Sequence, residues 1–333
     1  MERSKIIVIL IGFMLPCLVY AQENLDSKVV AYWSFDSLHN QNEILDLARE
    51  EWNTVTGNFY LKDGVRGRCI KLDGYTTQIE SDAFNQRLFN GFSISAWIAL
   101  QTYPWNLSPI INQGSSPGEN FGSDPEKDFF LGVDANGRPV FEVKTEDSLY
   151  RCVSEDKLPL LHWVHISGTF SLKEGLKLYI NGQLTGEENN IAGNFTGFSG
   201  DELWLGMNLE EMGPTGSERE ASADIGSKMV LHGLLDEVKI YQSDLSEKEI
   251  MLDYTSNLPG NRKPLKFEKL PSGPSYPFNS FGAYYTRLNY TEEWESFWRV
   301  DEYPDILVHF DKMPVKYIFW RGTGYGGVWV TEN

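Results

Sequence analysis

Two aromatic residues and an amide follow one of the strand-like segments of this sequence. Tyr103 and Trp105, with Pro104 between them, come directly before Asn106. A flat aromatic ring packs well against the apolar face of a sugar ring, and an amide both donates to and accepts from hydroxyls. We therefore expect Tyr103, Trp105 and Asn106 to lie exposed in a loop and to bind a ligand. The alternative is that Trp105 packs over the end of the fold.

Three aspartates are candidates for a calcium site. Asp36 follows a strand-like segment, Asp46 lies in the next loop, and Asp236 lies in the last strand-like segment. Carboxylate and carbonyl oxygens in loops and at strand ends are the ligands that calcium prefers. Calcium is therefore the one cofactor that we expect. The alternative is that Asp236 accepts hydrogen bonds from a neighbouring turn and that Asp36 simply ends a strand.

The sequence gives little support for catalysis. Asp236 and Glu237 are adjacent, so in a regular strand they point to opposite faces and cannot form the carboxylate pair of a glycosidase. His162 and His165 also fall on opposite faces of a strand, which disfavours zinc. A serine or cysteine nucleophile lacks support as well. The sequence favours a non-catalytic role and leaves the question of enzyme activity open.

Residues 1–21 have the features of a secretory signal peptide. Two basic residues precede the apolar run Ile6–Leu15, which is too short to cross a bilayer. Val19–Ala21 offers a small-residue cleavage site, so that Gln22 begins the mature chain. We expect a secreted, periplasmic or cell-surface protein with no membrane span in the mature chain. An uncleaved anchor is the alternative.

The acidity of the chain restricts its partners. Among 333 residues there are 29 Lys and Arg against 47 Asp and Glu, a formal net charge of -18. Removing the signal peptide, which has two basic residues and one acidic residue, makes this charge -19. Nucleic acids and anionic membranes bind basic surfaces. We therefore exclude both as partners and expect a glycan or an extracellular protein.

Two cysteines, Cys69 and Cys152, remain after removal of the signal peptide, and both lie in strand-like segments. In an oxidising compartment such a pair can form a disulfide. A disulfide requires a specific Cα separation, and the sequence does not show how far apart the two cysteines are. Two alternatives therefore remain: a Cys69–Cys152 disulfide, or two separate half-buried thiols.

Short strand-like segments recur along residues 29–241 and must position these side chains. The segment Phe92–Ile98 alternates between apolar and polar residues, as expected for a strand with one buried face. Asn136-Gly137 and Asn181-Gly182 are strong signals for tight hairpins. One helix begins at the capping box of Ser246. This pattern predicts an all-β, antiparallel, two-sheet sandwich.

An ordered series of motifs gives the chain a family resemblance. In order they are Ala31–Asp36, Gly64–Gly74, Phe92–Ile98, His162–Phe170, Leu178–Gly182, Leu203–Gly206, Gly233–Tyr241 and Leu245–Ile250. Together they resemble a LamG-like (laminin G-like) jellyroll domain of the concanavalin A-like lectin/glucanase superfamily over about residues 29–255. The resemblance implies a jelly-roll sandwich of two curved sheets, an extracytoplasmic setting, and often a role in adhesion or carbohydrate binding. It also implies that the first and last strands can bring Asp36 and Asp236 close.

Composition divides the chain into segments. Residues 22–257 form the sandwich, and residues 258–280, with five prolines, form a linker. Residues 281–333 hold 14 aromatics and several strand-like runs. A segment of 53 residues has too small an interior to bury so many large side chains on its own. We expect a short aromatic-rich β segment that begins a truncated second domain. The alternative is that it packs on the sandwich.

These observations favour a secreted non-catalytic binding module. We expect it to recognise carbohydrate or an extracellular protein partner through loops at one end of the sandwich. The alternative is an accessory domain of a larger carbohydrate-active enzyme, whose catalytic part is missing or begins near residue 281. A structural envelope or adhesion protein without a small ligand is a further option.

Overall fold

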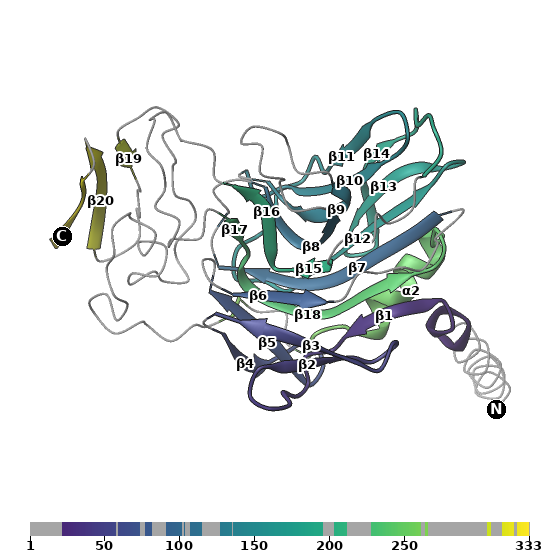
Figure 1. Ribbon diagram of the computed structural model, residues 1–333, viewed down its shortest axis with the longest axis horizontal. Helices are drawn as coiled ribbons and strands as arrows, with labels where there is room; N and C mark the ends of the chain where they lie inside the picture. Colours follow the sequence, from purple (N-terminus) through teal and green to yellow (C-terminus); the bar gives the residue numbers. More distant parts are fainter. Residues whose placement is uncertain are drawn as a thin grey trace, which may run out of the picture.

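The body of the protein is a sandwich of two antiparallel sheets (Figure 1). The computed structural model describes residues 22–57, 59–73, 77–81, 91–101, 103, 107–114, 127–134, 136–195, 203–211, 228–260, 264–265, 305–307, 315–322 and 325–332. Each of the two main sheets has eight strands and neither is closed into a barrel. The predicted all-β jelly-roll sandwich is confirmed.

Sheet A has the strand order β14-β13-β12-β7-β18-β5-β4, and β1 also pairs with β18. Its strands are β1 (Val29–Trp33), β4 (Tyr60–Asp63), β5 (Arg68–Asp73), β7 (Gly91–Leu100), β12 (Val164–Ser171), β13 (Gly175–Ile180), β14 (Gln183–Glu188) and β18 (His232–Tyr241). The predicted Asn181-Gly182 turn joins β13 to β14 with positive φ at both residues, 50° and 78°. Such angles match the twist of a two-residue hairpin.

Sheet B has the order β11-β10-β9-β8-β15-β6-β3-β2. Its strands are β2 (Glu43–Asp46), β3 (Glu51–Thr56), β6 (Gln78–Ser81), β8 (Ser108–Gly114), β9 (Lys127–Val133), β10 (Pro139–Lys144), β11 (Leu149–Val153) and β15 (Leu203–Leu205). The predicted hairpin at Asn136-Gly137 connects β9 to β10, with Gly137 at φ 80°.

Two smaller sheets complete the described strands. β16 (Met207–Glu211) pairs with β17 (Lys228–Val230), and β19 (Asp305–Leu307), β20 (Val315–Gly322) and β21 (Tyr325–Glu332) form a three-stranded sheet. The strand-like character expected near the C-terminus is therefore confirmed. Every residue from Val315 to Gly322 has a partner in β21. The final strand, β21, therefore pairs with β20, a pairing that we did not expect from the sequence.

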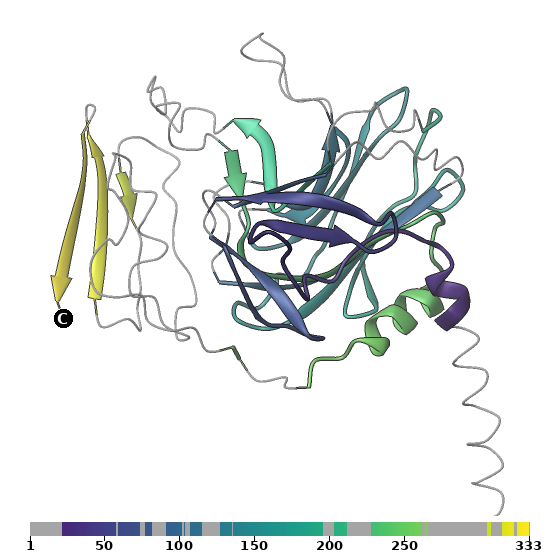
Figure 2. The same cartoon turned by 60° about the horizontal axis from the view of Figure 1, so that its bottom comes forward.

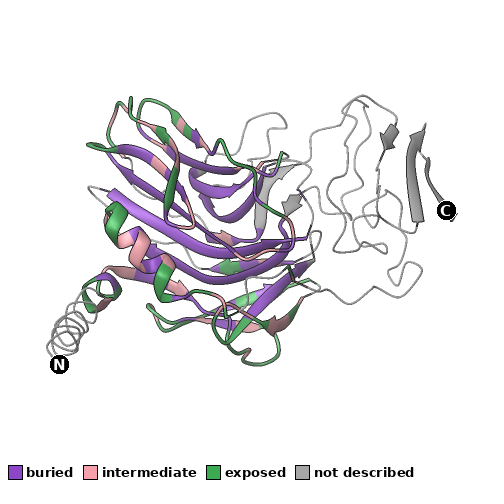
Figure 3. Ribbon diagram, turned by 180° about the vertical axis from the view of Figure 1, so that it is seen from behind, coloured by how far each residue is buried: buried purple, intermediate pink, exposed green. Residues whose placement is uncertain are grey.

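The core lies between the two sheets, where residues of β7 and β18 are buried along their whole length (Figure 3). Phe92 on β7 is at its centre and contacts four other rings at centroid distances of 5.4 to 6.0 Å. These rings belong to Phe129, Phe141, Phe170 and Phe195. Burying aromatic surface of this extent is the main force that holds the two sheets together.

Helix α2 (Glu247–Ser256) lies on the outer side of sheet A, beside the N-terminal segment (Figure 2). The expected capping box is present, because the Ser246 amide donates to the Glu249 carboxylate at 2.9 Å. Leu25 of the N-terminal segment packs with Ile250 of the helix and with Tyr179 and Tyr241 of the sheet. In the described part of the chain, we find no helix with the length and apolar character of a membrane span.

Of the two alternatives for Cys69 and Cys152, the structure shows separate thiols: no disulfide joins them, and both are free and buried. Cys69 lies on β5 near one edge of sheet A, whereas Cys152 lies on β11 at the opposite edge of the sandwich, against β14. The two side chains belong to different clusters and cannot meet. Burial raises the pKa of each thiol to about 12, so both are inert, protonated packing residues.

Candidate functional site

A pocket of about 800 Å³ lies on the outer side of sheet A, between β1, β18, α2 and the N-terminal segment. It is lined by Gln22, Asp26, Val29, Tyr32, Leu47, Ala48, Arg66, Glu237, Lys239, Leu252, Thr255, Ser256 and Asn257. This volume falls within the range of small-molecule sites, and the lining mixes apolar side chains with groups that form hydrogen bonds. We therefore take it as the candidate site.

The sheet pairing explains why Glu237 reaches this pocket. One edge of β18 pairs with β5 over His232–Leu235 and with β1 over Val238–Tyr241. Between these two partners β18 carries one extra residue relative to β7, a β-bulge at Glu237. The carboxylate therefore points into the space that neither neighbouring strand fills.

The bulge changes the orientation expected from strand alternation. Asp236 lies opposite Trp97, whose ring stacks on Tyr254 of α2, so Asp236 belongs to the outer side of the sheet. Glu237 contacts Tyr32, which also lines the pocket, so it lies on the outer side too. The expectation that Asp236 and Glu237 point to opposite faces is wrong, because the extra residue breaks the period of two.

The backbone at Glu237 is strained. Its φ is 50°, in the left-handed region that a non-glycine residue occupies at a cost of about 1–3 kcal/mol. Strain of this kind persists where the surrounding structure requires it, and it concentrates at functional sites. Here it aims a buried carboxylate into a pocket.

Three neighbours fix the Glu237 carboxylate. The Tyr32 hydroxyl donates to it at 2.9 to 3.0 Å, and the Asn257 amide donates at 3.2 Å. The Lys239 ammonium lies 3.9 Å away. Two of these groups come from strands and the third from the residue after α2, so the site depends on the packing of the helix against the sheet.

A buried ion pair supports the floor of the pocket. Lys239 donates to Asp253 of α2 at 3.0 Å, and the other oxygen of Asp253 lies 3.0 Å from Nε2 of His165. Both partners of the Lys239–Asp253 pair are buried. The pair locks α2 to β18 and β12 and so fixes the distance between Asn257 and Glu237.

Burial controls the protonation of the pocket groups. It raises the pKa of Glu237 above its usual value, although Lys239 and the Tyr32 hydroxyl oppose the rise. Burial, and then the negative charge of Glu237, raise the pKa of Tyr32, so its hydroxyl remains a donor at neutral pH. Although burial lowers the pKa of Lys239, Asp253 and Glu237 outweigh it and keep the amine charged.

The charges that line the pocket balance. Arg66 and Lys239 are cationic, and Asp26 and Glu237 are anionic. The Asp26 carboxylate accepts from the Gln22 amide at 2.8 Å. A neutral ligand with many hydroxyls fits such a lining better than a strongly charged one, because it meets both donors and acceptors without adding net charge.

Asp36 and Asp236 both accept hydrogen bonds from the loop that leads from β4 into β5. Asp236 accepts from the Val65 amide at 2.7 Å, and Asp36 accepts from the Arg68 amide at 2.9 Å. Burial, and then Glu237, raise the pKa of Asp236 to about 8, although the amides oppose this. Gly67, with φ 60°, lets the loop approach Asp36, since a Cβ there would clash with the carboxylate.

Asp46 lies apart from these two. It accepts from the Tyr32 and Ala48 amides at 3.0 and 2.9 Å, and it pairs with Arg49 at 2.6 Å. The structure therefore does not bring Asp36, Asp46 and Asp236 together, and its described residues contain no group of three side chains arranged to hold a metal. An arginine at the carboxylate competes with a cation for the same oxygens.

Calcium at Asp36 and Asp236 stays a prediction, and thermal unfolding tests it. A bound ion would raise the melting temperature when calcium is added, and a chelator would lower it. Asp36→Asn should remove this difference, because it deletes one charged ligand. A melting temperature that is the same with calcium and with chelator would overturn the prediction.

The predicted ligand loop is only partly described, and its described residue is buried. Tyr103 is 7% exposed, and its hydroxyl donates to the Leu158 carbonyl at 2.8 Å. The expectation of an exposed Tyr103 is wrong, because the ring packs over Gly137 and under the Lys157 amine. Trp105 and Asn106 lie outside the described residues.

One set of side chains has the residue types of a hydrolase triad. Ser167 Oγ lies 3.4 Å from Nδ1 of His165, whose Nε2 faces Asp253. All three are buried where α2 packs on sheet A, so a substrate has no access to the hydroxyl. The segment Gly114–Gly118 has the Gly-x-Ser-x-Gly spacing of a nucleophile turn, but Ser116 lies outside the described residues.

The sequence did not reveal Tyr32, Lys239, Asp253 and Asn257 as one group. Tyr32 and Glu237 are 205 residues apart, and each lies in a strand where its side chain could serve the core. The adjacent acidic pair Asp236-Glu237 was the one feature of the sequence that could have indicated this site. Whether both side chains lie on the same face depends on the bulge, and no local sequence pattern predicts the bulge.

Comparisons with known proteins describe the fold further. Curated protein sequences give no match to this chain. Domain 4 of AbnA, a GH43 extracellular arabinanase from Geobacillus stearothermophilus solved with arabinotriose, is 20% identical over 68% of this chain and 98% of that one, with a TM-score of 0.50.

Botulinum neurotoxin domains are also similar. The serotype D ligand-binding domain, solved with N-acetylneuraminic acid, is 15% identical over 75% of this chain and 57% of that one, with a TM-score of 0.53. The neurotoxin DC binding domain, solved with rat synaptotagmin II, is 16% identical over 73% of this chain and 56% of that one, with a TM-score of 0.51. This chain therefore spans little more than half of those toxin chains.

At such identities these likenesses concern the fold. The sequence profile of one family matches residues 73–251, which is more than half of the chain. This match covers the strands from β6 to β18 and the first half of α2, including the bulge at Glu237. The chain belongs to the laminin G-like family of the concanavalin A-like lectin/glucanases superfamily.

Proposed function

We propose that this protein is an extracytoplasmic, non-catalytic carbohydrate-binding module that holds a neutral sugar in the pocket beside β18. The observation that carries the proposal is the strained, buried Glu237, aimed into a pocket where Tyr32 and Asn257 donate to it. A carboxylate with fixed donors around it is suited to accept hydrogen bonds from sugar hydroxyls.

The remaining lining fits the same ligand. Leu47, Val29 and Leu252 offer apolar surface for the C–H face of a sugar, whereas Lys239 and Arg66 supply donors. The similar structures include a domain solved with arabinotriose, a neutral sugar that is the first probe, and one solved with N-acetylneuraminic acid, whose carboxylate makes it the charged comparison. The predicted signal peptide supports an extracytoplasmic location.

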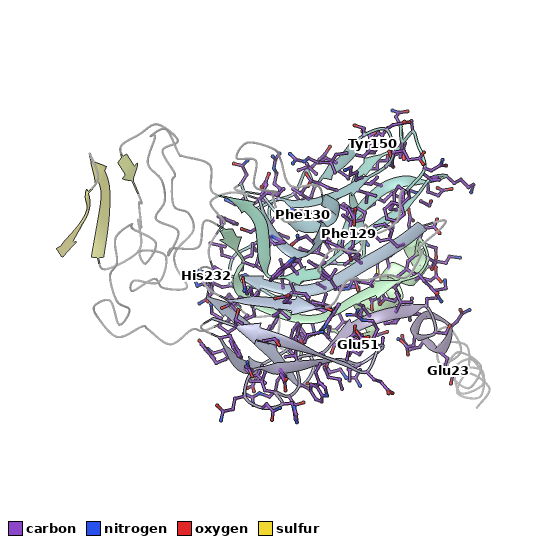
Figure 4. All side chains as sticks on the ribbon, viewed as in Figure 1. Glu23, Glu51, Phe129, Phe130, Tyr150 and His232 are labelled. Carbon is purple, nitrogen blue, oxygen red and sulfur yellow. The ribbon has the colours of Figure 1, made fainter. Side chains whose placement is uncertain are left out.

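A matched pair of tyrosine variants tests the pocket. Tyr32→Phe removes a hydroxyl that donates inside the pocket, and we expect about tenfold weaker binding of arabinotriose in calorimetric titration. Tyr150→Phe removes a hydroxyl on β11, far from the N-terminal side of the sandwich (Figure 4), where it accepts from the Ala192 amide at 2.9 Å. This control should bind like the wild type.

Two results would contradict the proposal. Equal affinities of the wild type and Tyr32→Phe would remove the pocket as the site. A loss of affinity in Tyr103→Phe instead would move the site to the loop predicted from the sequence. If the wild type binds neither sugar, a glycan array with neutral and acidic oligosaccharides decides whether any glycan binds.

An accessory domain of a larger carbohydrate-active enzyme is the second candidate. The favouring observation is the likeness to one domain of an arabinanase, almost all of which is covered by the alignment. Both candidates require sugar binding by the same pocket. The second candidate also requires that a natural chain containing residues 22–333 hydrolyses the sugar that it binds. Chromatography of the sugar after incubation with that chain shows whether hydrolysis products form.

A further inference from the structure

The wall of the pocket continues into an exposed strip along the β2–β3 hairpin. Leu47 follows β2, lines the pocket and is 44% exposed. Two residues earlier Leu45 pairs across the hairpin with Trp52 of β3. Leu47 and Ala48 lie in the turn that joins β2 to β3, so the hairpin that carries Trp52 on sheet B also reaches round the edge of the sandwich to the pocket rim.

Trp52 is unusually exposed for its type. It is 49% exposed, the largest value among the exposed large apolar side chains that the structure describes. The Asn53 and Val55 side chains, one and three residues further along β3, point inward, so alternation places Trp52 and Thr54 on the outer face of sheet B. An exposed tryptophan of this size costs free energy in water unless another surface covers it.

The ring is also held in place. His39 stacks on it at a centroid distance of 4.6 Å and an interplanar angle of 29°. Nδ1 of His39 lies 2.9 Å from the Glu43 carboxylate, which also accepts from the Asn40 amide at 2.8 Å. A ring fixed before binding loses little conformational freedom when a ligand packs on it.

We propose that the ligand is an oligosaccharide, whose first sugar occupies the pocket and whose next sugars cross Leu47 and stack on the His39–Trp52 pair. The Glu43 carboxylate and the Asn40 amide lie beside these rings and accept from and donate to hydroxyls of that sugar. This inference rests on the proposed function, because it requires the pocket to bind the first sugar.

Chain length is the variable that tests it. Calorimetric titration would use arabinose, arabinotriose and arabinopentaose, with xylose, xylotriose and xylopentaose as a second series. We expect the affinity of the wild type to rise from the monosaccharide to the trisaccharide. Trp52→Ala should lower the affinity for the longer sugars about tenfold and leave that for the monosaccharide unchanged.

Two variants control this comparison. Trp52→Phe keeps an aromatic ring and should retain most of the affinity. Tyr60→Ala removes a ring that is 48% exposed on β4, at an edge of the other sheet, and should bind like the wild type. Melting temperatures of all variants show whether each one is folded.

The outcomes separate this inference from the proposed function. Affinities that do not change with chain length, or a Trp52→Ala variant that binds like Tyr60→Ala, would overturn the extended site and leave the pocket standing. If the wild type binds neither series, nor any oligosaccharide of the glycan array, both are overturned. A loss for the monosaccharide in Trp52→Ala would place the first sugar on Trp52 and overturn the assigned order of sugars.

Discussion

Replacing Asp253 with asparagine is expected to lower the free energy of unfolding by about 3–5 kcal/mol at neutral pH. The variant leaves the buried Lys239 ammonium without the carboxylate that lies 3.0 Å from it, and it weakens the contact of α2 with His165. Denaturation by urea, followed by tryptophan fluorescence, measures this loss. Lys28→Gln is the control, because it breaks the more exposed Lys28–Glu249 pair of the same helix and should cost less than about 1 kcal/mol.

The same residue predicts how stability changes in acid. Burial raises the pKa of Asp253, but Lys239 and then His165 outweigh it, so its pKa in the folded protein lies below the usual value. A carboxylate with a lowered pKa stabilises the fold above its unfolded pKa of about 3.9, and this contribution is lost as the pH falls below it. The Asp253→Asn variant should therefore lose less stability than the wild type between about pH 5 and pH 2. Equal losses would contradict the assigned ion pair.

Replacing Glu237 with glutamine is expected to weaken sugar binding by about tenfold to a hundredfold, the effect of losing hydrogen bonds to a charged acceptor. Glutamine keeps the length of the side chain but offers one acceptor oxygen where the carboxylate offers two. Calorimetric titration of the wild type and the variant measures the change. Glu187→Gln, the same substitution at an exposed position of β14, is the matched control and should bind normally. Unchanged affinity in Glu237→Gln would remove Glu237 from the site.

The stability of the Glu237→Gln variant should respond to pH in the opposite sense to that of Asp253→Asn. Because burial raises the pKa of Glu237, ionisation opposes folding. The wild type therefore loses stability as the pH rises from the unfolded pKa of a glutamate, about 4.3, towards the raised value in the folded protein. The variant lacks this loss. Such a cost to the fold is what we expect of a residue that serves binding and not stability.

Local sequence patterns determined most of the sandwich. The strand at Phe92–Ile98, the Asn-Gly turns and the capping box at Ser246 are each decided by residues close in sequence, and the structure confirms them, although β7 is buried on both faces and not on one. The family resemblance rests on the same short motifs, and the family match confirms it. The physical reason is that strand period, turn angle and helix cap depend on a few neighbouring residues.

Burial at the ends of the sandwich could not be deduced in this way. Tyr103 looked like an exposed loop residue, but Gly137 and Lys157 cover its ring. Cys69 and Cys152 both lie in strands, and only the order of strands in the two sheets shows that they are at opposite edges. In each case the answer depends on residues distant in the sequence.

The candidate site shows this division most clearly. The sequence alone determined that Asp236 and Glu237 are adjacent acidic residues in a strand. Only the tertiary structure decided that β5 and β1 share one edge of β18, that the bulge between them turns Glu237 outwards, and that α2 brings Asn257 and Asp253 to the same place. The bulge against β7 coincides with the point where β5 ends and β1 begins on the other edge of β18, and that coincidence is a property of the assembled sheet.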